Sequence, residues 1–133
     1  MKTLIRKIIK EELFKKRAED HIKLMNDFLE FACNYLKVKK PKVALKFTRD
    51  GLVTTANYSN ETVKVYAKDR AIVDIMRSIA HELVHLRQDD DGRLNDKDFD
   101  INNDAGSPIE NEANAKAGEI IRKFGELRPE IYN

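Results

Sequence analysis

The 133-residue sequence contains one cysteine, no tryptophan and no long run of apolar residues. The single cysteine, Cys33, excludes an internal disulfide framework and a cysteine-rich zinc module. No segment approaches the ~18 apolar residues that a membrane span needs, and the first residues do not form the apolar core of a secretory signal peptide. These absences favour a soluble, cytoplasmic protein. The length fits a single domain that covers residues 1–133.

Charge is unevenly distributed along the chain, although the net charge is only +2. Residues 1–50 carry 14 Lys and Arg against 7 Asp and Glu, whereas residues 51–133 carry 11 against 16. A basic, amphipathic N-terminal helix could bind nucleic acid, an anionic membrane or an acidic partner. Glu11, Glu12 and the lack of tryptophan weaken the membrane interpretation, and no DNA-reading motif accompanies the basic residues. We therefore expect this helix to pack on its own domain or on a partner, and we do not expect nucleic acid as a partner.

The first two-thirds of the chain contain two patterns of apolar residues. Spacings of three and four predict an N-terminal helical region over residues 1–36, formed by two helices with a break within Lys15–Asp20. Residues 43–67 alternate apolar and polar side chains instead, with turn residues between the runs. This pattern predicts a small three-stranded antiparallel sheet with strands near 43–47, 52–58 and 62–67. The fold class is therefore α+β.

Two further helices are predicted in the last third of the chain. Helical spacing returns over residues 71–88. A stretch rich in aspartate follows at 89–106 and reads as a loop. Ser107 as N-cap and Pro108 as first helical residue then begin a last helix that runs to about residue 125.

An H-E-x-x-H motif, His81-Glu82-Leu83-Val84-His85, lies within the helix predicted at 71–88. A spacing of four residues places His81 and His85 on one helical face, where both can bind one metal ion. Glu82 lies about 100° around the helix from His81, near the metal but not directed at it. That is the expected position of a general base acting on a zinc-bound water, whose pKa falls to around 7.

Catalytic zinc needs a third protein ligand and one open position. Glu110 and Glu112 are the candidates, and helical phase distinguishes them. With Ile109 set at zero, the apolar face of the last helix centres at about 55°, Glu110 lies at about 100° and Glu112 at about 300°. A carboxylate on a buried face needs a compensating partner such as a metal ion, so Glu110 is the predicted ligand. Ala113 and Ala117, on the same side, allow a close approach to the motif helix.

A simpler interpretation of the same residues stays open. An H-E-x-x-H pattern can occur in any charged helix, and Glu110 stands three residues after Ser107, where it could be the reciprocal acid of a capping box. The mostly apolar neighbours of His81 and His85 favour a metal site over this interpretation.

The segment Ile79-Ala80-His81-Glu82-Leu83-Val84-His85 together with Glu110-Asn111-Glu112-Ala113-Asn114 resembles the zincin metallopeptidases, specifically the small gluzincin-like branch that includes the ImmA/IrrE family. The resemblance covers roughly residues 43–125, the expected catalytic core, and leaves the N-terminal helices outside. It implies a minimal zincin fold and Zn²⁺ bound by His81, His85 and Glu110. The basic start of the chain also resembles small metallopeptidases encoded by tailed phages.

The resemblance implies three further features. Asn114 stands where thermolysin-like enzymes have an Asp that orients a ligand histidine, and an amide can hold the imidazole without adding charge. The strand at Thr62–Ala67 would be a sheet edge that binds extended peptide by strand addition. The family also uses an oxyanion-stabilising residue that no motif assigns here, for which the candidates are Tyr58, Tyr66, Tyr132 and His21.

Two other features have interpretations that do not involve the motif. The Asp-rich stretch 89–106 fails the EF-hand spacing because Arg87 would stand at the first ligand position, so an acidic, solvated loop is the preferred interpretation. A lid over the cleft or a selector for basic substrates is the alternative for this stretch. Cys33 lies on an apolar helix face and is interpreted as a small core residue.

The sequence thus predicts a zinc-dependent metallopeptidase that hydrolyses peptide bonds through a metal-activated water, with Glu82 as general base. The alternative is a non-catalytic zinc-binding structural or interaction protein, favoured by Asn114, the unassigned oxyanion donor and the basic N-terminal helix. A nucleic-acid-associated protein with an accidental motif is a third hypothesis. The expected partner is a protein or peptide substrate, met in the cytoplasm or in a virion if the protein is phage-encoded.

Overall fold

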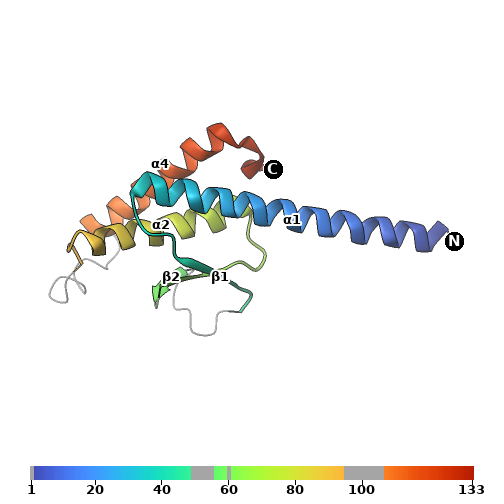
Figure 1. Ribbon diagram of the computed structural model, residues 1–133, viewed down its shortest axis with the longest axis horizontal. Helices are drawn as coiled ribbons and strands as arrows, with labels where there is room; N and C mark the ends of the chain where they lie inside the picture. The colour runs from blue at the N-terminus through green and yellow to red at the C-terminus, as the bar shows by residue number, and fades with distance from the viewer. Residues whose placement is uncertain (1, 49–55, 60, 95–106) are drawn as a thin grey trace.

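The computed structural model describes residues 2–48, 56–59, 61–94 and 107–133, a part of the chain that is mostly helical. The elements in chain order are α1 (Lys2–Leu36), β1 (Lys42–Lys46), β2 (Ala56–Ser59), β3 (Thr62–Tyr66), α2 (Ile72–Asp90), α4 (Pro108–Leu127) and the short 3-10 helix η1 (Pro129–Tyr132). Helix α2 is central, because it packs against α4, α1 and strands β2 and β3. The sheet lies on one side of α2, and α1 and α4 lie on the other (Figure 1).

The sheet is mixed, and the prediction of three antiparallel strands is wrong. Its strand order is β1-β3-β2, with β1 parallel to β3 and β2 antiparallel to β3. The minimal zincin fold expected with that sheet is corrected to a small, mostly helical α+β fold. The alternation of apolar residues reports which face of a strand is buried, and it carries no information on the direction of the neighbouring strand. Residues 52–55 of the predicted second strand lie outside the described residues.

Strand β3 is the central strand of this sheet and not its edge. It pairs with β1 on one side and with β2 on the other, so the expected peptide-binding edge at Thr62–Ala67 is wrong. Val63 and Val65 are fully buried and form the part of the core that lies under α2. Leu45 of β1, by contrast, is 43% exposed.

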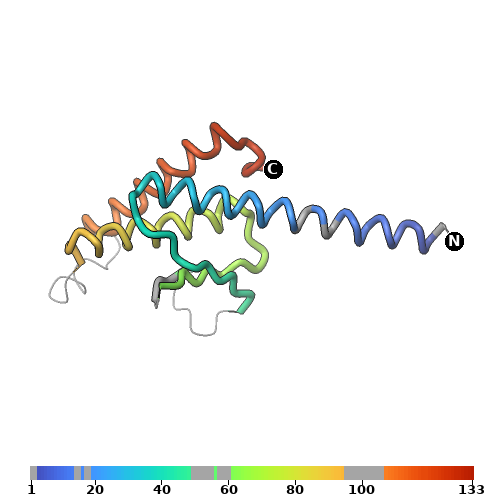
Figure 2. The backbone as a smooth tube through the Cα atoms, in the orientation of Figure 1, coloured from blue at the N-terminus to red at the C-terminus, as the bar shows by residue number. Residues whose placement is uncertain are grey.

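Helix α1 is one continuous helix, and the predicted break within Lys15–Asp20 is wrong. Lysine, arginine, alanine and glutamate are good helix formers, so a stretch without apolar anchors continues the helix and leaves it without packing. The N-terminal arm, which we define as residues 2–22, extends beyond the rest of the molecule (Figure 1 and Figure 2). Its large apolar side chains are exposed: Leu4, Ile5, Ile8, Ile9, Leu13 and Ile22. The side chains of the arm that the structure describes therefore do not pack on the rest of the domain.

From Leu24 onward α1 belongs to the core. Its buried apolar residues are Leu24, Phe28, Leu29, Ala32, Cys33 and Leu36. Phe28 packs edge-on against Phe124 of α4 with ring centroids 5.3 Å apart, and Phe31 lies 5.4 Å from the same ring. An ion pair of 2.7 Å between Arg128 and Asp27 joins the end of α4 to α1.

The starts of α2 and α4 agree with the local sequence. Arg70 donates hydrogen bonds to the carbonyl oxygens of Tyr66 (2.7 Å) and Asp74 (2.8 Å), which fixes the first turn of α2 to the end of β3. Ser107 is the N-cap of α4, as predicted, and its hydroxyl accepts a hydrogen bond from the backbone N–H of Glu110 at 3.2 Å. No helix in the described ranges combines the length and the apolar character that crossing a membrane requires.

Candidate metal centre

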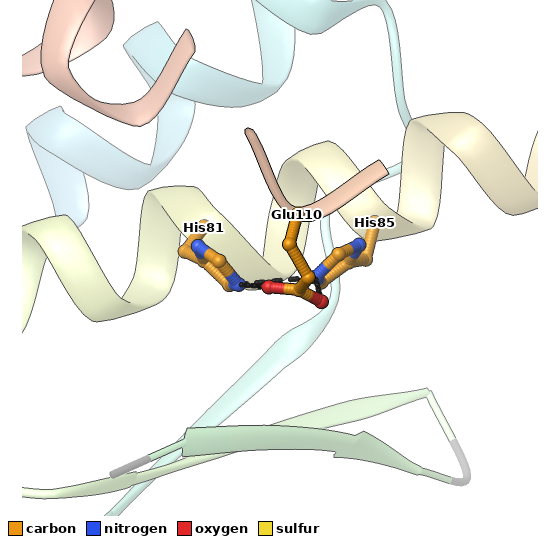
Figure 3. A group of neighbouring side chains, drawn as sticks. All are labelled: His81, His85 and Glu110. Carbon is orange, nitrogen blue, oxygen red and sulfur yellow. Dashed lines mark hydrogen bonds and ion pairs between the residues drawn. The ribbon is translucent and has the colours of Figure 1, made fainter. Parts of the chain in front are cut away.

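His81 and His85 of α2 and Glu110 of α4 meet at one point between the two helices (Figure 3). The two Nε2 atoms lie 3.0 Å apart. The carboxylate of Glu110 lies 3.1 Å from Nε2 of His81 through one oxygen and 3.0 Å from Nε2 of His85 through the other. Within the described ranges, this is the one group of His, Cys, Asp and Glu side chains that is arranged to hold a metal ion.

Close packing of α2 on α4 brings these side chains together. Ala113 and Ala117 of α4 and Ala80 of α2 are almost fully buried, and small side chains let two helices approach closely. The apolar face of α4 is the one expected from its periodicity, and Glu110 lies at its border with a side chain that is 16% exposed. The helical-phase argument therefore places Glu110 correctly beside the two histidines.

The chemistry of the three donors fits a zinc ion. Ligand atoms of a tetrahedral zinc site with bonds near 2.0–2.1 Å lie ~3.3 Å from one another. The observed separations of 3.0–3.1 Å differ from this value by a few tenths of an ångström. Small rotations of the side chains would accommodate the ion, so the site is close to its binding geometry.

Glu82 follows His81 in α2, and its carboxyl group is half-buried and close enough to Glu110 to be affected by its charge. Burial raises its pKa to about 7, and the nearby charge of Glu110 contributes to the same effect. Such a carboxyl group exchanges protons near neutral pH, as a general acid–base residue must. The role of Glu82 as a general base stays a prediction.

His81 is held in its neutral form by its surroundings. Burial lowers the pKa of this imidazole, the proximity of His85 lowers it further, and Glu110 and a hydrogen bond that the ring donates to the Asn114 side chain oppose the shift. Neutral imidazole is the form that binds metal. Asn114 therefore contacts a motif histidine, as its position in the resemblance implied.

Gln88 is a site residue that sequence reasoning missed. It is fully buried, and its side-chain oxygen lies 2.7 Å from Nδ1 of His85. Its amide nitrogen donates to the carbonyl oxygen of Ile109 at 3.1 Å and to Glu112 at 3.3 Å. The available signal was its position three residues after His85, on the same side of the helix. Glu112 also forms a bidentate ion pair with Arg93 at 2.7 and 2.9 Å.

The candidates for an oxyanion-stabilising residue lie in different parts of the chain. Tyr132 packs over Gly125, because a Cβ atom at Gly125 would lie 2.6 Å from its hydroxyl group. Gly125 is fifteen residues beyond Glu110, about 22 Å along the helix, so Tyr132 is not an oxyanion donor at this site. His21 lies exposed on the N-terminal arm, and Tyr66 is half-buried at the end of β3. The side chain of Tyr58 and residues 95–106 of the Asp-rich stretch lie outside the description.

Comparisons of this chain with protein families, with curated proteins and with solved structures find no match. The functional argument consequently depends on the geometry and chemistry of the site.

Proposed function

We propose that the protein is a zinc-dependent metallopeptidase. The observation that supports this proposal is the convergence of His81, His85 and Glu110 on one point beside the half-buried carboxyl group of Glu82. Two histidines and one glutamate form a known donor set of catalytic zinc, which leaves one coordination position for solvent or substrate. Zinc is favoured over calcium and magnesium, because imidazole nitrogen is a poor ligand for those hard cations.

The side chains have separate roles in the proposed reaction. When bound, Zn²⁺ supplies a Lewis acid that polarises a carbonyl group and brings the pKa of water to around 7. His81, His85 and Glu110 hold the ion, and Asn114 orients the imidazole of His81. Glu82 accepts a proton from the attacking water and returns it to the amine that leaves when the peptide bond breaks.

The substrate class is proposed from the motif pair. The segments around His81 and Glu110 resemble those of gluzincin-like peptidases, and a carbonyl group attacked by activated water is the common chemistry of such sites. The likeness is one of motif and spacing only, because the sheet differs from the expected arrangement.

Zinc content and Glu82-dependent cleavage test the proposal together. Purified wild type and Glu82→Gln should each carry about one zinc per chain by elemental analysis, and His81→Ala should carry none. On a broad peptide library, wild type should cleave and Glu82→Gln should be slower by about 10²–10⁴-fold. Glu119→Gln is the matched control, because Glu119 lies on α4 and pairs with Lys123 away from the site. Equal cleavage by wild type and Glu82→Gln would contradict the proposed role of Glu82.

A zinc-binding interaction protein is the second candidate function. It is favoured by the N-terminal arm, whose apolar side chains at Leu4, Ile8 and Leu13 are between 45% and 62% exposed, as are their neighbours Ile5 and Ile9. Exposed apolar patches of this kind commonly mark partner surfaces. This function predicts one zinc per chain in wild type and no library cleavage that depends on Glu82.

A further inference from the structure

Gln88 is the one polar side chain among the described residues that is fully buried. A buried amide must satisfy both its oxygen and its nitrogen, and here both have partners from different helices. Its oxygen faces His85 on its own helix α2, and its nitrogen faces Ile109 and Glu112 on α4. The side chain thus spans the contact between the two helices that carry the metal ligands.

The orientation of this amide follows from the partner of its nitrogen. The backbone carbonyl of Ile109 can only accept a hydrogen bond, so the NH₂ group must face it. The second neighbour of the nitrogen, the carboxylate oxygen of Glu112 at 3.3 Å, also accepts. The oxygen of Gln88 is therefore directed at Nδ1 of His85, 2.7 Å away, and it can only accept there.

This orientation favours one position for the hydrogen of His85. When Nδ1 donates to Gln88, Nε2 of the neutral ring bears the lone pair, whereas without a metal ion the Glu110 carboxylate at 3.0 Å competes by attracting a hydrogen to Nε2. Nε2 is the atom that faces Glu110 at 3.0 Å and His81 at 3.0 Å. The lone pair needed to bind a metal is thus directed at the position where the other two donors converge.

We propose that Gln88 is the positioning residue of the metal centre, fixing His85 in the tautomer and ring orientation that present Nε2 to the ion. The inference rests on the proposed metal site. Glu112 supports Gln88 from the outer side. Its carboxylate accepts hydrogen bonds from Arg93 and from the amide nitrogen of Gln88. A chain of contacts therefore runs from Arg93 at the surface to the ligand His85.

The first test measures zinc affinity by competition with a chromophoric chelator. Gln88→Leu keeps the approximate volume and removes both hydrogen-bonding groups, so zinc should bind about 10- to 100-fold more weakly than to wild type. Ser78→Ala is the matched control on α2, because it removes a partly buried hydrogen bond from Arg70 without touching the site. It should lower the melting temperature and leave the zinc affinity unchanged.

The second test observes the tautomer directly in metal-free protein. Long-range ¹H–¹⁵N NMR spectra at mildly alkaline pH are recorded in Glu110→Ala, where no carboxylate attracts a hydrogen to Nε2. They should show the hydrogen of His85 on Nδ1, and a mixture of tautomers when Gln88→Leu is added. Gln88→Met, which also lacks the amide and keeps the length of the side chain, serves if Gln88→Leu does not fold.

The outcomes separate the two proposals. If wild type binds no zinc, the proposed function fails, and the NMR spectra still decide the tautomer of His85. If wild type binds zinc and Gln88→Leu binds it equally well, the positioning role is wrong. A Glu110→Ala spectrum with the hydrogen on Nε2 of His85 would likewise overturn it.

Discussion

Glu110 and Glu112 stand two residues apart on α4 and contact different parts of the molecule. The carboxylate of Glu110 faces His81 and His85 at 3.1 and 3.0 Å, whereas that of Glu112 forms a bidentate pair with Arg93. Glu112 is exposed at its outer side, with 28% of its side chain accessible. Glu110 is therefore placed to bind a metal ion, whereas Glu112 is placed to pair with Arg93.

The first prediction compares the variants Glu110→Gln and Glu112→Gln. Glu110→Gln should lose most of its zinc affinity, because an uncharged amide replaces a ligand carboxylate. Its melting temperature should no longer rise when zinc is added, since bound metal stabilises the fold. Glu112→Gln retains an oxygen for Gln88 and should bind zinc nearly as wild type does, with a stability loss of at most ~1 kcal/mol. Calorimetric titration checks both, and the reverse order of effects would reject the ligand assignment.

The second prediction separates helix capping from metal binding. The Ser107 hydroxyl caps the backbone N–H of Glu110, while the Glu110 carboxylate faces the histidines, so the two groups act independently. Ser107→Ala should cost about 1 kcal/mol of unfolding free energy, the same with zinc as with a chelator. Denaturant unfolding under both conditions measures this. If the loss of unfolding free energy in Ser107→Ala differs between zinc and chelator, the cap at Ser107 and the proposed ligand Glu110 are coupled.

The third prediction concerns the N-terminal arm. Because the described side chains of residues 3–23 are exposed, removal of residues 2–20 should leave the melting temperature nearly unchanged. Phe28→Ala is the contrasting variant: this side chain is fully buried against Phe124, so its loss should cost about 3–5 kcal/mol. Thermal unfolding by circular dichroism tests both. A large destabilisation by the truncation would mean that the arm contributes to folding.

The fourth prediction concerns the reactivity of Cys33. Burial raises the pKa of this thiol from 9.0 to about 11, with a small opposing effect of Lys40. Alkylation by iodoacetamide should therefore be slow in the native protein at mildly alkaline pH and fast in denaturant, since the thiolate is the nucleophile. Equal labelling rates in the native and denatured protein would contradict the burial of this side chain.

The same shift has a consequence for stability. The folded-state pKa of Cys33 is higher than the unfolded value, so the unfolded chain loses its proton first as the pH rises. The free energy of unfolding should fall as pH rises from about 9 to about 11. The fall should be smaller in Cys33→Ala, which isolates this group from the lysines that titrate in the same range.

Local signals in the sequence predicted the helices that carry the site. The cap at Ser107 and the periodicity around Ile109 determined the start and the buried face of α4, and hence the placement of Glu110. Helical spacing did the same for His81 and His85. These features depend on interactions within a few residues, which a sequence pattern records directly.

Features that depend on tertiary contacts were not predictable in this way. The direction of β1 relative to β3 is decided by the path of the connecting chain, which alternation does not report. Gln88 reads as an ordinary polar residue near a helix end until α4 places Ile109 and Glu112 beside its amide. The prediction of a break in α1 is wrong because a stretch without apolar anchors indicates that the helix is exposed, and not that it ends.

The buried alanines between α2 and α4 fix the distance between the two helices that carry the three proposed ligands. Two donors are anchored on one helix and the third on the other, so the distance between the helix axes sets the span across which an ion is chelated. The side chains of Ala113 and Ala117 are buried, at 0% and 1% exposure, so a larger side chain there would displace the atoms packed against it. A single valine at position 113 would push the helices apart and enlarge the span without altering any proposed ligand. At the proposed site, the radius of the ion that fits would therefore depend on methyl groups that are not ligands.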